Sequence, residues 1–158
     1  MVAEGIGSLS IRAAVEADLA ALQLLYRHLH PQDPELSPAQ AQAGWHRLLA
    51  HPGTTVFLGT LPSGLAVTSC TLHVMPNLTR NAAPYGVIEN VVTHEQHRQR
   101  GYGKSVLARA LAESWRQGCY KVMLMTGSKR ESTLRFYEAA GFHREKTAFV
   151  ARPPGSAG

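Results

Sequence analysis

The sequence has few cysteines and no long apolar run. Its two cysteines, Cys70 and Cys119, are too few for a disulfide framework. The apolar runs fall far short of the roughly 20 residues that a membrane-spanning helix needs. The first residues, Met1-Val-Ala-Glu-Gly-Ile-Gly, lack the basic and apolar regions of a signal peptide. We therefore expect a soluble, cytoplasmic protein that has no membrane partner.

Acidic residues are scarce in one quarter of the chain. The net charge is +5, yet residues 98–135 contain nine Lys or Arg and only two acids, and the rest of the chain is net negative. Aromatic residues in this basic segment are sparse and do not interleave with the charges as they do in single-strand binders. We expect no nucleic-acid partner, and a local site for a small polyphosphate instead.

The length indicates one compact domain. The chain has 158 residues, of which 44% are hydrophobic, and shows neither an internal repeat nor a linker. We predict a flexible N-terminus over 1–8, a single domain over 9–150 and a flexible tail over 151–158.

Hydrophobic periodicity predicts alternating strands and helices. In chain order these are a strand Leu9–Ala13, a helix Leu19–Leu29, a helix Ser37–His51, a hairpin of Thr54–Thr60 and Leu65–Met75, a strand Tyr85–Thr93, a helix Val106–Ser114 ended by Gly118, a strand Tyr120–Met125, a helix Glu131–Ala140 and a last strand Phe142–Val150. This order is typical of a mixed α/β fold built around one sheet.

The segment Arg98-Gln-Arg-Gly-Tyr-Gly-Lys104 joins a predicted strand to a predicted helix. Glycines at a helix entry let backbone N–H groups converge on an anion, and the helix N-terminus adds positive charge. A P-loop would need glycine where Arg98 stands, and a dinucleotide fingerprint would need glycine where Val106 stands, so both motifs fail.

The pattern R-x-x-G-x-G that remains resembles the GNAT superfamily of N-acetyltransferases. The resemblance is densest in Ile88–Gly103, Gly118–Leu124 and Phe136–Phe142. Within the superfamily, the sequences of Ile88–Val92 and Cys119–Val122 are similar to those of glucosamine-6-phosphate N-acetyltransferases. It implies a mixed, mostly antiparallel central sheet, flanked by about four helices and splayed at an acetyl-CoA site.

The resemblance also implies how the cosubstrate acetyl-CoA would be held. The turn would bind the pyrophosphate and the preceding strand would pair with the pantetheine arm. The implied contacts are Val91, Val92, Thr93, Arg98, Gln99, Arg100, Gly101, Tyr102, Gly103 and Lys104. Members of the family often have an asparagine before the segment that corresponds to Phe136-Tyr137, whereas residues 128–134 contain none. That contact is lost or replaced, with Arg130 as the candidate.

Acetyl transfer to an amine needs a base, because freeing the lone pair of an alkylammonium costs about 4 kcal/mol at neutral pH. Glu89 is the candidate, and we expect it on the same face as Val87 and Val91, partly buried so that its pKa rises. The alternative is a carboxylate that caps a loop. Tyr137 is the candidate acid for the leaving thiolate, and its alternative is a core aromatic.

The remaining assignments concern the acceptor and a metal. Candidate substrate-side residues are Asn90, Arg80, Tyr85 and Thr126. The spacing His94-x-x-His97 offers at most two ligands, so no metal is expected. We predict an acetyl-CoA-dependent N-acetyltransferase acting on a small-molecule amine, such as an amino sugar. The resemblance alone suggests a homodimer. The alternatives are a CoA-binding regulatory module without turnover and a protein N-terminal or lysine acetyltransferase.

Overall fold

The structure, a computed structural model, describes residues 8–156. Residues 1–7 and 157–158, which belong to the predicted flexible ends, lie outside the described residues. The described chain forms two compact units, one ending at Leu124 and the other beginning at Met125. The single domain predicted for 9–150 stays a prediction.

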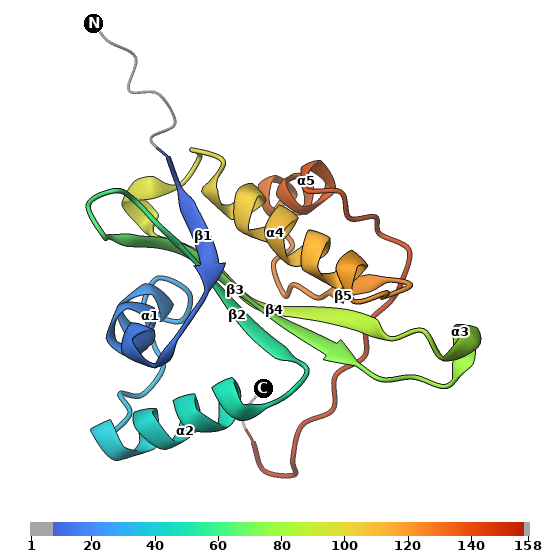
Figure 1. The fold of residues 1–158 in the computed structure, drawn as a ribbon, viewed down its shortest axis with the longest axis horizontal. Coiled ribbons are helices and arrows are strands. Elements are labelled where there is room, and N and C mark those ends of the chain that lie inside the picture. The colour runs from blue at the N-terminus through green and yellow to red at the C-terminus, as the bar shows by residue number, and fades with distance from the viewer. Residues whose placement is uncertain (1–7, 157–158) are drawn as a thin grey trace, which may run out of the picture. The chain divides into compact units, whose positions relative to one another are not determined.

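The first unit is built around a five-stranded sheet with the strand order β1-β2-β3-β4-β5 (Figure 1). All neighbours are antiparallel except β4 and β5, which are parallel. The strands are β1 Ser10–Ala13, β2 Thr54–Thr60, β3 Ala66–Met75, β4 Tyr85–Thr93 and β5 Val122–Leu124. The helices are α1 Leu19–Tyr26, α2 Pro38–Ala50, α3 Thr79–Ala82 and α4 Tyr102–Arg116, with short 3-10 turns η1 Glu16–Asp18 and η2 Glu95–His97. The predicted mixed, mostly antiparallel fold class is confirmed.

Local sequence signals explain where the longer helices begin and end. The Ser37 hydroxyl accepts a hydrogen bond from the Gln40 amide, and the Gln40 side chain accepts one from the Ser37 amide. This capping box, together with Pro38 in the first turn, starts α2 where the sequence predicts. Helix α4 lies between Gly101 and Gly118, which both adopt left-handed φ values, of 80° and 78°.

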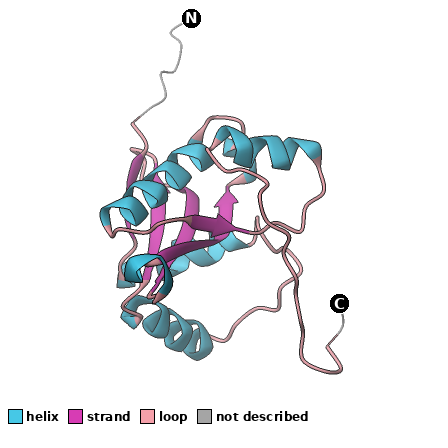
Figure 2. Cartoon of the chain, turned by 90° about the vertical axis from the view of Figure 1, so that its right-hand side faces the viewer, coloured by secondary structure: helices cyan, strands magenta, loops and turns pink. Residues whose placement is uncertain are grey.

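The sheet separates two layers of helix in the first unit (Figure 1, Figure 2). On one face, Leu22 and Leu25 of α1 and Trp45 of α2 pack with Val56 and Leu58 of β2. On the other face α4 packs against the sheet through an apolar stripe made up of Val106, Leu107 and Ala110. No helix within residues 8–156 is long and apolar enough to cross a membrane.

The second unit contains α5, Glu131–Ala139, and an extended segment after it. The last strand predicted over Phe142–Val150 is wrong, because these residues form neither helix nor strand. Four polar residues, 143–146, interrupt the alternation, and the apolar pair that follows is exposed, with Phe149 at 93%. Such a segment has too little apolar surface on one face to bury against a sheet.

Candidate functional site

Strand β4 contains a β-bulge over residues 90–91. Its pairing with β3 sets Glu89 opposite Thr71 and Val92 opposite Ser69. Two residues of β4 therefore face a single residue of β3. A bulge of this kind bends the strand and changes the direction in which the neighbouring side chains point.

The bulge changes which side chains share a face. Asn90 adopts a left-handed φ of 52°, and beyond it the alternation is shifted, so Val92 lies on the face of Glu89 and packs in the core beneath α1 and α2. The expectation that Val91 shares a face with Glu89 is wrong for this reason. The partial burial expected for Glu89 is also wrong, because its side chain is exposed.

The sheet is open between β4 and β5 beyond Ile88. The two strands pair over Gly86–Ile88 and Val122–Leu124, and the pairing ends there. Within the described residues, Glu89–Thr93 therefore has no partner on the side of β5. Its backbone donors and acceptors on that side are available to an extended ligand, which is the opening that the sequence predicts.

The turn before α4 is shaped for a close approach to its backbone. Gln99 and Gly101 have left-handed φ values of 61° and 80°. Arg98 holds the start of the turn, since its guanidinium donates to the carbonyl oxygens of Thr93 at 3.2 Å and His28 at 3.3 Å.

Beyond the turn, the first N–H groups of a helix have no partner within the helix, and the helix dipole favours an anion there. Arg100 and Lys104 are exposed beside this end of α4, whereas Tyr102 and Gly103 are buried.

Two of the predicted substrate-side residues, Arg80 and Tyr85, take part in cation–π contacts near the start of β4. The guanidinium of Arg80 lies over the Tyr120 ring, 5.7 Å from its centroid, and the Lys121 ammonium lies 5.7 Å from the Tyr85 centroid. Arg80 belongs to α3, where three consecutive residues have left-handed φ values. Their role toward a substrate stays a prediction.

The second unit contains Tyr137 and Thr126. Tyr137 is half-buried, and its ring meets those of Phe136 and Phe142 edge to face, at centroid distances of 5.0 and 6.4 Å. The Thr126 hydroxyl accepts from the Ser128 amide at 3.1 Å. Arg130 is exposed at the start of α5.

Both cysteines, Cys70 and Cys119, are buried free thiols. Burial raises the pKa of Cys70 to about 12 and also raises the pKa of Cys119. Cys70 lies in β3 as predicted, whereas Cys119 precedes β5. Thiols with raised pKa values are poor nucleophiles.

Histidines gather near the turn, where the rings of His28 and His94 lie 4.1 Å apart and those of His94 and His97 lie 5.2 Å apart. Burial lowers the pKa of His97, and the nearby Arg100 and His94 act in the same direction. Within residues 8–156, no group of three His, Cys, Asp or Glu side chains is placed to hold a metal.

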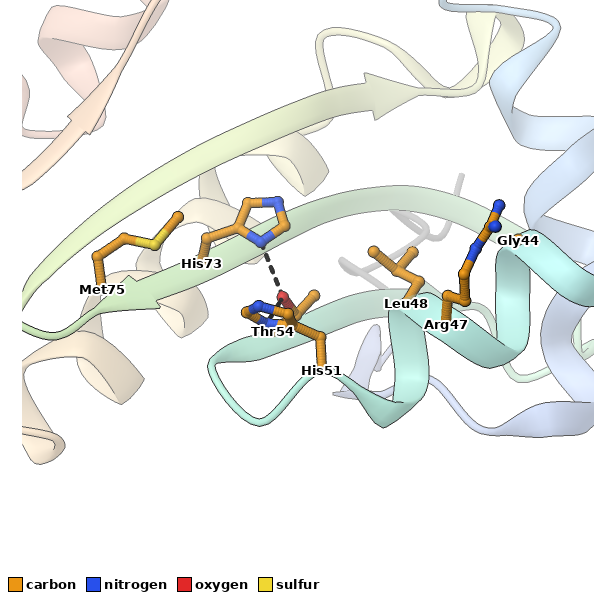
Figure 3. A pocket seen from close by; sticks show the side chains of 7 residues that line it. All are labelled: Gly44, Arg47, Leu48, His51, Thr54, His73 and Met75. Atoms are coloured by element: carbon orange, nitrogen blue, oxygen red, sulfur yellow. Dashed lines mark hydrogen bonds between the residues drawn. The ribbon is translucent and has the colours of Figure 1, made fainter.

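A pocket of about 410 Å³ between α2 and the sheet was not found by sequence reasoning (Figure 3). Its lining comes from α2, its C-terminal end and the β2–β3 hairpin: Gly44, Arg47, Leu48, His51, Thr54, His73 and Met75. No motif marks these residues. The predicted hairpin was the one available signal, because its register sets Thr54 opposite His73.

Comparisons with known proteins agree with this geometry. The sequence model of the Acetyltransferase (GNAT) family matches residues 19–142. The glucosamine 6-phosphate N-acetyltransferase of Trypanosoma brucei brucei is 34% identical over 137 residues, which are 87% of this chain and 90% of that protein. A solved chain from Agrobacterium tumefaciens str. C58 is 46% identical, with a TM-score of 0.87 over 91% of this chain and 99% of its own. A solved Trypanosoma brucei acetyltransferase is 30% identical, with a TM-score of 0.79 over 92% of this chain and 100% of its own.

Proposed function

Because the chain belongs to the GNAT family of acetyltransferases and is an acetyl-CoA-dependent acyltransferase, we propose that it acetylates the primary amine of a small amino sugar. The observation that carries the proposal is the open edge of β4 beyond Ile88, in the strand that leads into the α4 turn. An extended arm that contains amide groups can pair with the open edge of β4. A pyrophosphate can bind at the α4 turn. The named relative acts on glucosamine 6-phosphate, which makes this amine the first acceptor to test.

In the first unit, some residues bind acetyl-CoA and another transfers a proton. Main-chain amides of the α4 turn hold the pyrophosphate, and backbone groups of Val91–Thr93 orient the thioester. Bound acetyl-CoA supplies the activated acetyl group. Glu89 removes a proton from the acceptor ammonium, which frees the lone pair that attacks the thioester carbonyl. Tyr137 is our proposed proton donor for the departing sulfur.

Thiol release from acetyl-CoA, measured with a panel of amines, tests this function. The panel contains glucosamine 6-phosphate, glucosamine, an amino acid, a polyamine and a peptide with a free N-terminus. We expect the highest kcat/KM with glucosamine 6-phosphate. A peptide that reacts faster would favour the protein acetyltransferase alternative. Acetyl-CoA binding without turnover on any amine would favour the regulatory module.

Two glycines at the ends of α4 give a matched test of the turn. A Cβ built on Gly101 or Gly118 meets no atom within 4 Å, and each residue has a left-handed φ. Alanine at either position should therefore cost a similar 1 to 2 kcal/mol of stability, roughly. We expect only Gly101→Ala to weaken acetyl-CoA binding, by about tenfold, because the distortion falls where main-chain amides meet phosphates. Calorimetry measures both affinities, and equal values would remove the turn from the site.

A further inference from the structure

Two histidines share one hydroxyl in the pocket beneath α2. The Thr54 Oγ1 atom lies 2.8 Å from His73 Nδ1 and 2.9 Å from His51 Nδ1 (Figure 3). A hydroxyl has a single proton, so it donates to one ring and must accept from the other. The three side chains therefore form a continuous chain of donors and acceptors, in which one imidazole carries its proton on Nδ1 and the other on Nε2.

His73, at one end of this hydrogen-bonded series, lies beside Glu89. His73 pairs with Val87 and Thr71 pairs with Glu89, so His73 and Glu89 are diagonal neighbours on one face of the sheet. Long side chains at such positions are within reach of each other. Thr54 occupies the Nδ1 atom of His73, which leaves Nε2 as the ring nitrogen that can exchange a proton with the carboxylate.

The electrostatic surroundings of His73 suit a proton acceptor. Burial and the neighbouring His51 lower the pKa of His73, and together they outweigh Glu89, which acts in the opposite direction. The remaining charged side chain that lines the pocket is Arg47 of α2. His73 is therefore neutral near pH 7 and has a lone pair to offer.

His51, at the other end of this hydrogen-bonded series, is exposed to water. His51 ends α2 and its side chain is exposed, whereas His73 is half-buried. A proton that arrives at the Nδ1 atom of His51 can thus be balanced by release of the Nε2 proton to solvent. Each acetylation of an ammonium group yields an amide, a thiol and one proton, and that proton must leave Glu89 before the next turnover.

We propose that His73, Thr54 and His51 form a relay that carries the acceptor's proton from Glu89 to solvent; this rests on the proposed function. Glu89 takes the proton from the ammonium nitrogen and passes it to His73 Nε2. The Nδ1 proton of His73 moves to Thr54 Oγ1 as the hydroxyl proton moves to His51 Nδ1. His51 then releases its Nε2 proton to water. One proton enters, one leaves, and exchange with solvent restores the starting tautomers.

Thr54→Val and Thr54→Ser separate the relay from a structural role. Valine keeps the shape of threonine without the hydroxyl, and serine keeps the hydroxyl. We expect Thr54→Val to lower kcat about tenfold at pH 7 with the KM for acetyl-CoA unchanged, and Thr54→Ser to stay within about twofold of wild type. A high concentration of imidazole buffer should restore kcat in Thr54→Val, because an external base then discharges Glu89.

A second pair of variants guards against a folding defect in β2. His51→Phe removes the exposed end of the relay, and His46→Phe removes a histidine of α2 that pairs with Glu16 outside it. We expect a loss of kcat that imidazole restores in His51→Phe, and wild-type kcat in His46→Phe.

Three outcomes would overturn the relay: wild-type kcat in both Thr54→Val and His51→Phe, equal losses in Thr54→Val and Thr54→Ser, or a loss that imidazole does not restore. Turnover of the wild-type protein on the same amine reports separately on the proposed function. If the wild type turns over and the variants match it, only the relay fails. If the wild type acetylates no amine, the proposed function fails and the relay fails with it.

Discussion

Glu89→Gln is expected to lower kcat at pH 7 by about 10²–10⁴-fold while acetyl-CoA affinity is kept. Glutamine fills the same volume but cannot take a proton. An alkylammonium with a pKa near 10.4 is almost wholly protonated at neutral pH, and freeing its lone pair costs about 4 kcal/mol. The exposed position of Glu89 on the open part of β4 leaves its carboxylate accessible to an incoming amine.

The pH dependence of Glu89→Gln distinguishes a base from a residue that only shapes the site. As the pH rises, more of the amine is already neutral, so the variant should recover part of its rate relative to wild type. Glu95→Gln is the matched control, because Glu95 is an exposed acid on η2, close in sequence. We expect wild-type kcat in this control. An unchanged rate in Glu89→Gln from pH 6 to 9 would leave Glu89 without a catalytic role.

Tyr137→Phe is the second variant with a large expected effect. If the Tyr137 hydroxyl protonates the leaving thiolate, turnover should fall by about 10²–10⁴-fold with little change in acetyl-CoA binding. The ring itself is retained, so its edge-to-face contacts with Phe136 and Phe142 remain. The cost in stability should therefore stay near 1 kcal/mol, the contribution of one hydrogen bond.

Steady-state rate and melting temperature, measured together, decide the role of Tyr137. A large loss of rate with a nearly unchanged melting temperature supports the acid. A rate within threefold of wild type, with a lower melting temperature, would make Tyr137 a core aromatic and leave protonation of the thiolate to water. Phe142→Leu is a useful control, because it alters the same aromatic cluster without removing a hydroxyl.

The sequence predicts the elements whose signals are local. Ser37-Pro38 marks the start of α2, and the strand pattern of Tyr85–Thr93 marks β4 with its observed bounds. Alternation alone fails inside β4, because the bulge depends on how the strand pairs with β3 and one residue out of register reverses every side chain beyond it. The last strand fails because strand propensity is weak without a partner strand to bury it.

The candidate site also contains one part with a local sequence signal and one part that depends on the tertiary fold. The α4 turn is a contiguous motif, and the structure gives it the left-handed backbone that its glycine predicts. His51, Thr54 and His73 come together only because α2 ends where β2 begins and the hairpin folds back upon itself. The spacing of these three residues along the sequence does not show the pocket, and the predicted hairpin indicates only that Thr54 and His73 lie on neighbouring strands.

The burial of the two cysteines has a practical consequence for colorimetric measurement of this enzyme. Burial raises the pKa of Cys70 to about 12, so this thiol is almost wholly protonated at pH 8. Both cysteine side chains are also buried, which screens them from reagent. A disulfide dye added to the native protein should therefore report free CoA with little background from the protein. Slow growth of a protein-derived signal would follow local unfolding, which makes the same dye a probe of conformational opening around β3.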